Sequence, residues 1–487
     1  MRVGALSLGT IGVLACGSPD AEATTEQATS ASTAMSTPTT GEGDASTSTP
    51  TTGGGDTEGP GEGACAAELL AEPAAEVTYY VAIGEPGASN EACDGLAPSD
   101  EGGGRCPFKD LSAPMVLGLL DGVKSTRMAL RAGTYVVSGW DGLRVTGIGA
   151  SEAERVVLSA YAGEPVVLDV ATPDGATCMA DDAPDRPECV REVVRVSGQW
   201  TAVQGLTIRN GLGYNLEVTG GAHHLVRCNH FTETVDFPLR SDSLKLDGGA
   251  SDIAVNSNVF TRWRSQAIDV TGVSEVWIEG NEFSEPHDAD GGAIGCKFGT
   301  RDVTIRGNTI HDLGEDPEMK VFSLGGTGSS HPDDAEAYRI RVEGNHITGV
   351  AGKLAQFVGC QECAFIGNDA VEVGAGVLLS AAATGLPECE DGVAGCLANA
   401  GTEIRGNRMR GLHGGGDPAS ADFFVAVDAG EATGLVAGDN VYCAGVADGH
   451  KFGWNGGILG FAAWVEMAAT DATSQAPVAG DAACAGW

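Results

Sequence analysis

The sequence predicts an all-β protein whose main body is a single-stranded right-handed parallel β-helix, a solenoid in which every coil adds one strand to each sheet. Three observations predict this fold. A pattern of hydrophobic-x-hydrophobic-x-Gly-Asn-x-hydrophobic, seen in GCKFGTRDVTIRGNTI at 295–310, recurs along the chain. Short segments with alternating apolar residues precede it, without helical periodicity between them. Units of about 20 to 40 residues of this kind are typical of solenoids.

The first 16 residues predict an export signal. They carry one cationic residue, Arg2, followed by an apolar run too short to span a bilayer. The end of this run, Val13-Leu14-Ala15-Cys16, resembles the lipobox of bacterial lipoproteins, although Leu14 stands where a small residue is usual. The resemblance implies cleavage before Cys16 and acylation of its thiol. The alternative is plain secretion, with Cys16 discarded.

Residues 17–63 predict a disordered, extended tether. They consist almost wholly of Ser, Thr, Gly, Pro, Ala and acidic residues, and STPTTG occurs twice. Such a segment buries too little apolar area to offset the entropy lost on ordering the chain. We therefore expect it to give the body reach from its point of attachment.

Residues 64–190 predict the N-terminal cap and the first coils. Apolar residues at helical spacing from Phe108 to Leu120 predict a short capping helix that covers the open end of the core. The region resembles the opening of secreted β-helix proteins of the pectate lyase-like superfamily. This likeness implies the fold more than a reaction, because the superfold hosts lyases, hydrolases, binding proteins and scaffolds. The resembling segments are YYVAIGEPGASN at 79–90, CPFKDLSAPMVLGLLDG at 106–122, LRAGTY at 130–135 and VVLSAYAGEPVVLDV at 156–170.

Residues 191–446 predict the repeats of the solenoid, and 447–487 a C-terminal cap that contains Trp454 and Trp464. In each repeat an asparagine follows the second strand. Its side chain can bond to the backbone of the next coil, and asparagine tolerates a left-handed turn conformation. We expect these residues to stack into a structural ladder: Asn229, Asn258, Asn281, Asn308, Asn345, Asn368 and Asn407.

Fourteen cysteines in an exported chain predict disulfide bonds. Short separations favour four pairs: Cys93–Cys106, Cys178–Cys189, Cys389–Cys396 and Cys360–Cys363. A redox or zinc role for the last pair is disfavoured, because no second pair lies at metal-ligand spacing. Cys228 and Cys296 alternate with apolar neighbours, which predicts small core residues.

The charge balance limits the partners. With 28 basic and 67 acidic residues the formal net charge is -39, which disfavours nucleic acid and anionic lipid surfaces. We expect a monomer that touches a membrane only through its N-terminal lipid and whose partner is a polysaccharide or another component of the cell surface.

The candidate site is a stripe of charged residues between core positions of stacked strands, because side chains alternate between the two faces of a strand. Glu217, Lys245, Asp247, Asp269 and Lys297 face outward on neighbouring coils. A lyase could use Lys245 or Lys297 as its base with Asp269 nearby. The alternative is a set of ordinary cross-strand ion pairs on a solvated face.

The stripe also suggests contacts to a substrate and to calcium. We expect Glu217, Arg262 and Arg264 to contact the substrate, and the two arginines to hold its carboxylate. Calcium is the one cofactor to consider, with ligands from Asp247, from Asp269, and from the acidic loop holding Asp288 and Asp290. No acidic loop keeps the spacing of a calcium hand, and no histidine pattern predicts zinc.

The coils around 267–310 are similar to the catalytic coil pair of the alginate lyase and chondroitinase B group, which implies a lysine on one strand and Arg-His on the next. Thr271 takes the lysine place and Lys297-Phe298 the Arg-His place, so the match fails at the reacting residues. The sequence therefore favours a surface-anchored protein that binds polysaccharide. Two alternatives stay open: a calcium-assisted lyase acting by β-elimination on a uronic-acid glycan, and a glycoside hydrolase that uses Asp247 and Asp269.

Overall fold

The structure is a computed structural model that describes residues 65, 75–122, 124–170, 178, 186, 189–234, 241–287, 292–314, 316, 319–326, 336–380, 398–410, 423–428, 433–444, 451–477 and 484. Internal contacts divide the chain into two units, 1–57 and 58–487, and every described residue belongs to the second. The predicted export signal, Cys16, the tether, Asp288, Asp290 and the Cys389–Cys396 pair lie outside the described residues. No helix in the described part is both long and apolar enough to cross a membrane.

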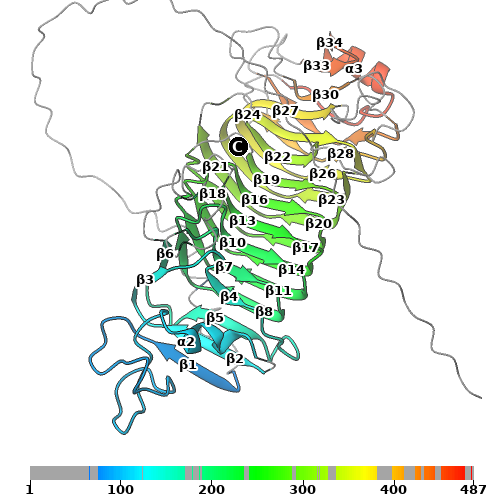
Figure 1. Ribbon diagram of the computed structural model, residues 1–487. Coiled ribbons are helices and arrows are strands. Elements are labelled where there is room, and N and C mark those ends of the chain that lie inside the picture. Colours follow the sequence, from blue (N-terminus) through cyan, green and yellow to red (C-terminus); the bar gives the residue numbers. More distant parts are fainter. Residues whose placement is uncertain are drawn as a thin grey trace, which may run out of the picture. The chain divides into compact units, whose positions relative to one another are not determined.

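The second unit is a parallel β-helix, as the repeats predicted (Figure 1). Each coil contributes one strand to each of three stacked faces, which we call sheets A, B and C. Successive strands pair in parallel, so that β10 pairs with β13 and β13 with β16 on one face, while β11 pairs with β14 on another. Among the described strands, only β33 and β34 pair antiparallel.

Sheet A contains β1 (Val77–Val81), β2 (Thr126–Leu130), β5 (Val156–Ala160), β8 (Gln199–Gln204), β11 (Ala222–Arg227), β14 (Ser251–Asn256), β17 (Ser274–Glu279), β20 (Thr300–Arg306), β23 (Ala337–Glu343), β25 (Cys360–Gln361), β26 (Ala364–Ile366), β28 (Glu403–Arg405) and β31 (Val436–Gly438). Sheet B contains β3 (Gly133–Val137), β6 (Val166–Val170), β9 (Thr207–Arg209), β12 (His230–Thr232), β15 (Val259–Thr261), β18 (Glu282–Ser284), β21 (Thr309–Gly314), β29 (Arg408–Arg410) and β32 (Val441–Cys443). Sheet C contains β4 (Leu143–Val145), β7 (Glu192–Val196), β10 (Tyr214–Thr219), β13 (Asp242–Asp247), β16 (Gln266–Thr271), β19 (Gly292–Lys297), β22 (Lys320–Gly325), β30 (Val425–Val427), β33 (Phe452–Trp454) and β34 (Gly457–Leu459). Two long strands, β24 (His346–Val358) and β27 (Asp369–Ser380), run through both B and C and join them.

The core lies inside the coils and consists of stacked like residues. Phe231, Phe260 and Phe283 occupy equivalent positions on successive strands of sheet B, and adjacent ring centroids are 4.9 Å apart. All three side chains are fully buried. Because one coil repeats the next, a single alternating pattern fills the interior at close to crystal density.

The asparagines form a continuous ladder at the turn between sheets A and B. The backbone N–H of Asn281 donates to Oδ1 of Asn308 at 2.9 Å, and its Nδ2 donates to the same oxygen and to the carbonyl of Val255. The pattern repeats from Asn229 to Asn407, whose N–H donates to Oδ1 of Asn440.

The expectation that the ladder asparagine itself is left-handed is wrong. Positive φ belongs to the residue before it, for example +62° at Gly280 and +62° at Gly307. Cys228 and Ser257 take the same conformation with φ of +54° and +55°. Glycine recurs before the asparagine because it adopts this conformation without a steric cost.

Both ends of the described solenoid carry short helices. The helical turn near the N-terminus comprises α2 (Pro114–Leu117) and η1 (Gly118–Leu120), which is shorter than the predicted span because Phe108 instead forms a parallel bridge with Val81. At the other end α3 (Phe461–Ala468) buries Trp464 against Phe452, with ring centroids 5.2 Å apart.

Five disulfide bonds are present among the described cysteines. The predicted pairs Cys93–Cys106, Cys178–Cys189 and Cys360–Cys363 are confirmed. The prediction that Cys228 is a core residue is wrong, because it lies in the turn after β11 and bonds to Cys65, 163 positions earlier. Cys443 bonds to Cys484. Cys296 is buried and free, as predicted.

Candidate functional site

The candidate site lies on the outer face of sheet C. On β13 and β16, Leu244, Leu246, Ile268 and Val270 point into the core and are fully buried. The residues between them point outward, so Lys245 lies directly beside Asp269, its register partner. The alternation of apolar and charged residues therefore fixes a charged column across neighbouring coils.

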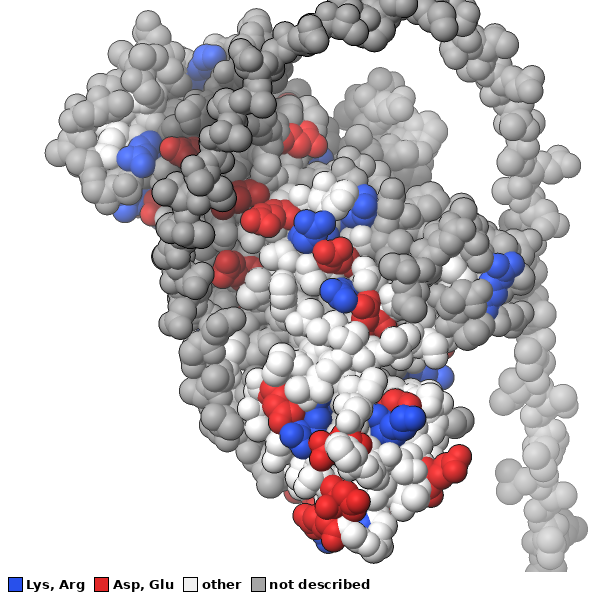
Figure 2. Space-filling view, turned by 90° about the vertical axis from the view of Figure 1, so that its left-hand side faces the viewer, with Lys and Arg blue, Asp and Glu red and all other residues white. Residues whose placement is uncertain are grey.

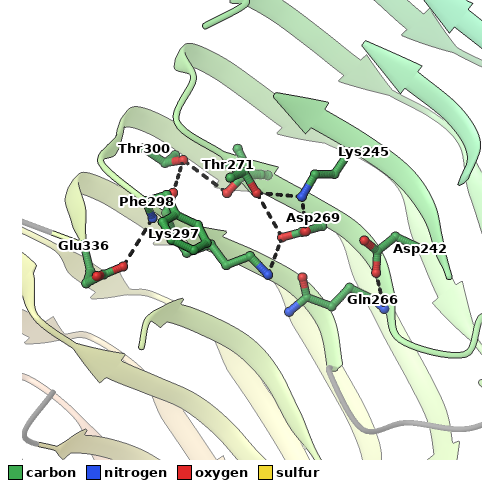
Figure 3. A network of polar contacts seen from close by, with 10 residues as sticks. Asp242, Lys245, Gln266, Asp269, Thr271, Lys297, Phe298, Thr300 and Glu336 are labelled. Carbon is green, nitrogen blue, oxygen red and sulfur yellow. Dashed lines mark hydrogen bonds and ion pairs between the residues drawn. The ribbon is translucent and has the colours of Figure 1, made fainter. Parts of the chain in front are cut away.

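Two lysines hold one aspartate at the centre of this column (Figure 3). The ammonium group of Lys245 donates to Oδ2 of Asp269 and, at 2.8 Å, to Oγ1 of Thr271. Lys297 approaches Oδ1 of the same carboxylate from the next coil at 3.1 Å. The Asp269 side chain is only 4% exposed, and that of Lys297 is 20% exposed. We call these three residues the lysine–aspartate cluster.

The surroundings of Lys245 keep it charged. Burial alone would lower the pKa of its ammonium group, but the attraction and hydrogen bond of Asp269 outweigh burial and raise the pKa above its ordinary value. The expectation of a solvated stripe is wrong here, because Lys245 and Asp269 are both buried. A buried ion pair of this kind is a rigid feature whose partners cannot be removed singly without a large cost.

Buried carboxyl groups continue the column toward the N-terminus. Glu217 pairs with Arg195 at 3.2 Å, and Glu192 lies 3.2 Å from Arg191. Burial, reinforced by the neighbouring charge of Glu217, raises the pKa of Glu192 to about 7. Burial and then the charge of Asp269 raise the pKa of Asp242, which accepts a hydrogen bond from the backbone N–H of Gln266 at 3.1 Å. Glu192 and Asp242 therefore hold their protons to a higher pH than ordinary carboxyl groups do.

The open edge of the face is the end of each strand, where sheet C turns toward sheet A. Register places Thr219 beside Asp247 and Thr271 beside Lys297 along this edge. We call this row the rim. Phe298 follows Lys297 and is 44% exposed, which makes it one of the most exposed large apolar residues in the described chain.

The structure brings some predicted residues together and leaves others apart. Lys245, Asp269 and Lys297 share one cluster, with Glu217 beside Lys245 on the preceding coil and Asp247 at the end of the strand that carries Lys245. Arg262 and Arg264 instead follow β15, where Arg262 pairs with Glu233 at 3.2 Å and Arg264 donates to the carbonyl of Thr234. The assignment of these arginines to a substrate carboxylate therefore has no geometric support from their observed contacts.

The calcium assignment is equally unsupported in the described part of the chain. Among the described residues, no group of three or more His, Cys, Asp or Glu side chains is placed to hold a metal ion. Asp288 and Asp290 lie outside the described residues.

Four residues of this face were missed by sequence reasoning. Arg195 is the register partner of Glu217 one coil earlier, in EVVRVSG, so extending the column backward would have found it, whereas Glu192 is in register with Tyr214 at the start of the strand. Asp242 stands at the start of its strand, outside the alternating core, and only its burial makes it notable. Alternation with Ile294 and Cys296 predicted Phe298 inside the core, which is wrong, because β19 ends at Lys297 and Phe298 lies in the turn, 44% exposed.

Comparison with known proteins supports the architecture. Residues 192–387 match the model of a protein family described as the right handed beta helix region. The fold is thus a right-handed parallel β-helix. No curated protein sequence matches the chain.

Several solved structures are similar to this chain at low sequence identity. Pectate lyase Pel9A is 14% identical over 77% of this chain and 82% of its own, with a TM-score of 0.45. An alginate lyase from Paenibacillus sp. str. FPU-7 is 13% identical over 61% and 92%, with a TM-score of 0.41. The A-module of the mannuronan C-5 epimerase AlgE6 from Azotobacter vinelandii is 12% identical over 73% and 91%, with a TM-score of 0.44. Likenesses at this level do not indicate a function.

Proposed function

We propose that the protein binds a polysaccharide along the outer face of sheet C, with the chain of sugars lying along the rim across successive coils. The observation that carries the proposal is the lysine–aspartate cluster, in which buried ion pairs fix an ammonium group of Lys297 at the open edge. Preorganised polar groups bind a ligand without the entropic cost of ordering them. Strands that repeat at about 4.8 Å offer a linear polymer equivalent groups on each coil.

A location outside the cytoplasm belongs to the same proposal. The five disulfide bonds of the described chain are typical of proteins that fold in an oxidising compartment. Acylation of Cys16 would then attach the body to the cell envelope, and residues 17–63 would set its distance from the membrane. The acidic residues of the chain would keep it from adhering to anionic lipid.

The lyase alternative is less well supported by the geometry. A lysine that removes a proton in β-elimination must be neutral, whereas Asp269 raises the pKa of Lys245. The hydroxyl of Thr271 and the carboxylate of Asp269 also occupy the ammonium group of Lys245. Lys245 is better suited to organise the cluster than to act as a base.

One observation favours hydrolysis as a second candidate function. Because the pKa of Asp242 is raised, this carboxyl holds its proton to a higher pH than an ordinary aspartic acid, whereas Asp269 is paired with two lysines. A protonated and an ionised carboxyl on adjacent strands are the pair that glycoside hydrolysis requires. Asp242 and Asp269 replace the earlier pair of Asp247 and Asp269 in this candidate.

The proposal is tested with the purified full chain on a panel of immobilised neutral and uronic-acid polysaccharides, with calcium or with EDTA. We expect retention of at least one glycan by the wild type, and a loss of about tenfold or more in Lys297→Ala, since hydrogen bonds to charged groups contribute about 1.5–3 kcal/mol. Arg341→Ala is the matched control, because Arg341 is an exposed cation on the outer face of sheet A.

Product analysis of the same incubations separates the candidate functions. Unsaturated products that depend on calcium would favour the lyase, and new reducing ends that disappear in Asp242→Asn would favour the hydrolase. Equal retention by Lys297→Ala and Arg341→Ala, or retention of no glycan by the wild type, would contradict the proposed binding face.

A further inference from the structure

Phe298 stands at a position where the other coils of this face use glycine. The turn from sheet C to sheet A begins directly after the rim residue of each strand. Gly220 follows Thr219, Gly248 follows Asp247 and Gly272 follows Thr271, whereas Phe298 follows Lys297. The hydrogen bonds of these turns are equivalent, since the N–H of Gly220 donates to the carbonyl of Asp247 and that of Gly272 to the carbonyl of Lys297.

The backbone at this position is left-handed in all four coils. The φ angles are +71° at Gly220, +62° at Gly248, +61° at Gly272 and +55° at Phe298. Glycine adopts this conformation without a steric cost, whereas a bulky residue is strained in it. The turn geometry therefore does not account for a phenylalanine where the equivalent turns of the three preceding coils carry glycine.

Packing does not account for Phe298 either. Its side chain is 44% exposed, in contrast to Phe231, Phe260 and Phe283, which stack in the core. The contact that secures the turn is made by the backbone, because the N–H of Phe298 donates to Oε2 of Glu336 at 3.3 Å (Figure 3). Any residue at position 298 except proline could make this contact.

The neighbours of Phe298 supply the polar half of a binding site. Lys297, the preceding residue, is the member of the lysine–aspartate cluster that is partly exposed. Thr271 lies beside Lys297 in the register and accepts a hydrogen bond from Lys245. An exposed aromatic ring next to a fixed ammonium group and a hydroxyl group combines an apolar surface with directional donors, as small-ligand sites do.

We propose that Phe298 is a sugar-stacking subsite, on which the apolar C–H face of one sugar ring of the bound polysaccharide lies while Lys297 and Thr271 bind its oxygen atoms. This inference rests on the proposed function and adds the residue that positions one ring along the rim. The subsite selects pyranose units that present an unsubstituted C–H face, because bulky substituents would lift the ring from the aromatic surface. The strained turn holds Phe298 outward at the rim.

The experiment compares Phe298→Gly and Phe298→Tyr with the wild type in the full chain, with thermal unfolding and retention on the glycan selected above as two readouts. Phe298→Gly should unfold at the same or a higher temperature, because glycine relieves the left-handed strain. Its retention should fall about tenfold, the effect of losing one buried aromatic contact. Phe298→Tyr should keep retention, because its ring is the same size. Trp277→Ala is the matched control, since Trp277 is an aromatic residue 39% exposed on β17 of sheet A.

The outcomes separate the subsite from the wider proposal. Retention that is unchanged in Phe298→Gly would overturn the subsite while the binding face stands, provided that Lys297→Ala still loses retention. A lower unfolding temperature in Phe298→Gly would show that the ring packs against the fold, which also overturns the inference. Loss of retention in Trp277→Ala to the same degree would move the sugar to sheet A, and a wild type that retains no glycan would overturn the subsite and the binding face together.

Discussion

The side-chain amide of Asn281, in the asparagine ladder, makes all the hydrogen bonds that it can. The side-chain amide of Asn281 donates to the carbonyl of Val255 and to Oδ1 of Asn308, and its own Oδ1 accepts from the backbone and the side chain of Asn258. All four hydrogen-bonding positions of the amide are thereby satisfied in a site that excludes water. A residue with so many buried partners contributes to stability chiefly through what its removal would leave unpaired.

We expect Asn281→Ala to lower the free energy of unfolding by about 3 kcal/mol, because it leaves a buried carbonyl and a buried N–H without partners. Thermal or urea unfolding of the purified chain measures this loss. Asn256→Ala is the control, since Asn256 lies on the outer side of β14 and outside the ladder. Equal losses in the two variants would contradict the role of the ladder.

Glu192 predicts a pH dependence of stability. Its pKa is raised from 4.5 to about 7 in the fold, so the folded chain binds more protons than the unfolded chain between these two values. The contribution of Glu192 is therefore fully present below about pH 4.5 and is lost as the pH rises through about 7, a loss of about 3 kcal/mol.

Glu192→Gln should remove this dependence. We expect its unfolding temperature to exceed that of the wild type at pH 8 and the difference to shrink toward pH 5. Paired thermal melts at the two pH values check this. A Gln variant that is less stable than the wild type at pH 8 would mean that the ionised carboxylate is well paired with Arg191.

At the residue scale, the sequence predicted which face of a strand a side chain lies on better than how deeply that side chain is buried. Alternation placed Lys245, Asp269 and Lys297 on one face because side-chain direction follows from strand geometry alone. Burial of that face could not be predicted, since it depends on what packs against the outside of the sheet. Cys228 was misassigned because its partner, Cys65, is remote in the chain and belongs to no repeat.

At the element scale, α3 is the piece that closes the C-terminal end of the core. Its Trp464 is buried, stacks on Phe452, and donates from Nε1 to Oδ2 of Asp471 at 2.8 Å. The same carboxylate oxygen accepts from the hydroxyl of Tyr442 on β32. The helix is thus fixed by both apolar packing and a buried polar group, which covers the open end of a stacked sheet.

Trp464→Ala should destabilise the protein by about 4 kcal/mol, as expected for a large core aromatic residue, and should promote self-association through the uncovered end. Thermal unfolding and size-exclusion chromatography measure the two effects. Met467→Ala on the same helix is the control, because Met467 is largely exposed. A Trp464 variant as stable and monodisperse as the control would show that α3 is not needed to close the core.

The sequence predicted the types of the elements well, but it did not predict that two strands continue from sheet B into sheet C. The repeats predict short separate strands, whereas β24 and β27 run on without a break from sheet B into sheet C. The turn residues that separate B from C in earlier coils are absent there, and a bend within one strand cannot be distinguished from a turn by alternation alone.

The negative net charge of the whole molecule does not appear on every part of its surface. The formal net charge is -39, yet acidic and basic side chains alternate over the described part of the face in Figure 2. Locally balanced pairs of this kind, such as Glu279 with Arg306 at 2.8 Å, leave little field of their own. The excess of acidic residues therefore acts at long range, where it repels an anionic polymer before contact.

Salt should consequently act differently on neutral and anionic glycans. We expect retention of a uronic-acid glycan to increase as ionic strength rises from about 0.01 to about 0.15 M, because the screening length falls from about 30 to about 8 Å. Retention of a neutral glycan should change little. Affinity electrophoresis at the two ionic strengths makes this comparison, and anionic glycans that bind more tightly at low salt would contradict the repulsion.

The most direct test of the proposed binding face is hydrogen–deuterium exchange of the full chain with and without a retained oligosaccharide. We predict slower exchange on binding in the peptides that cover β16 and β19 and the turn that follows β19, with sheet A peptides such as β14 and β17 unchanged. Protection confined to sheet A, or to either end of the solenoid, would place the ligand elsewhere and contradict the assignment of sheet C as the binding face.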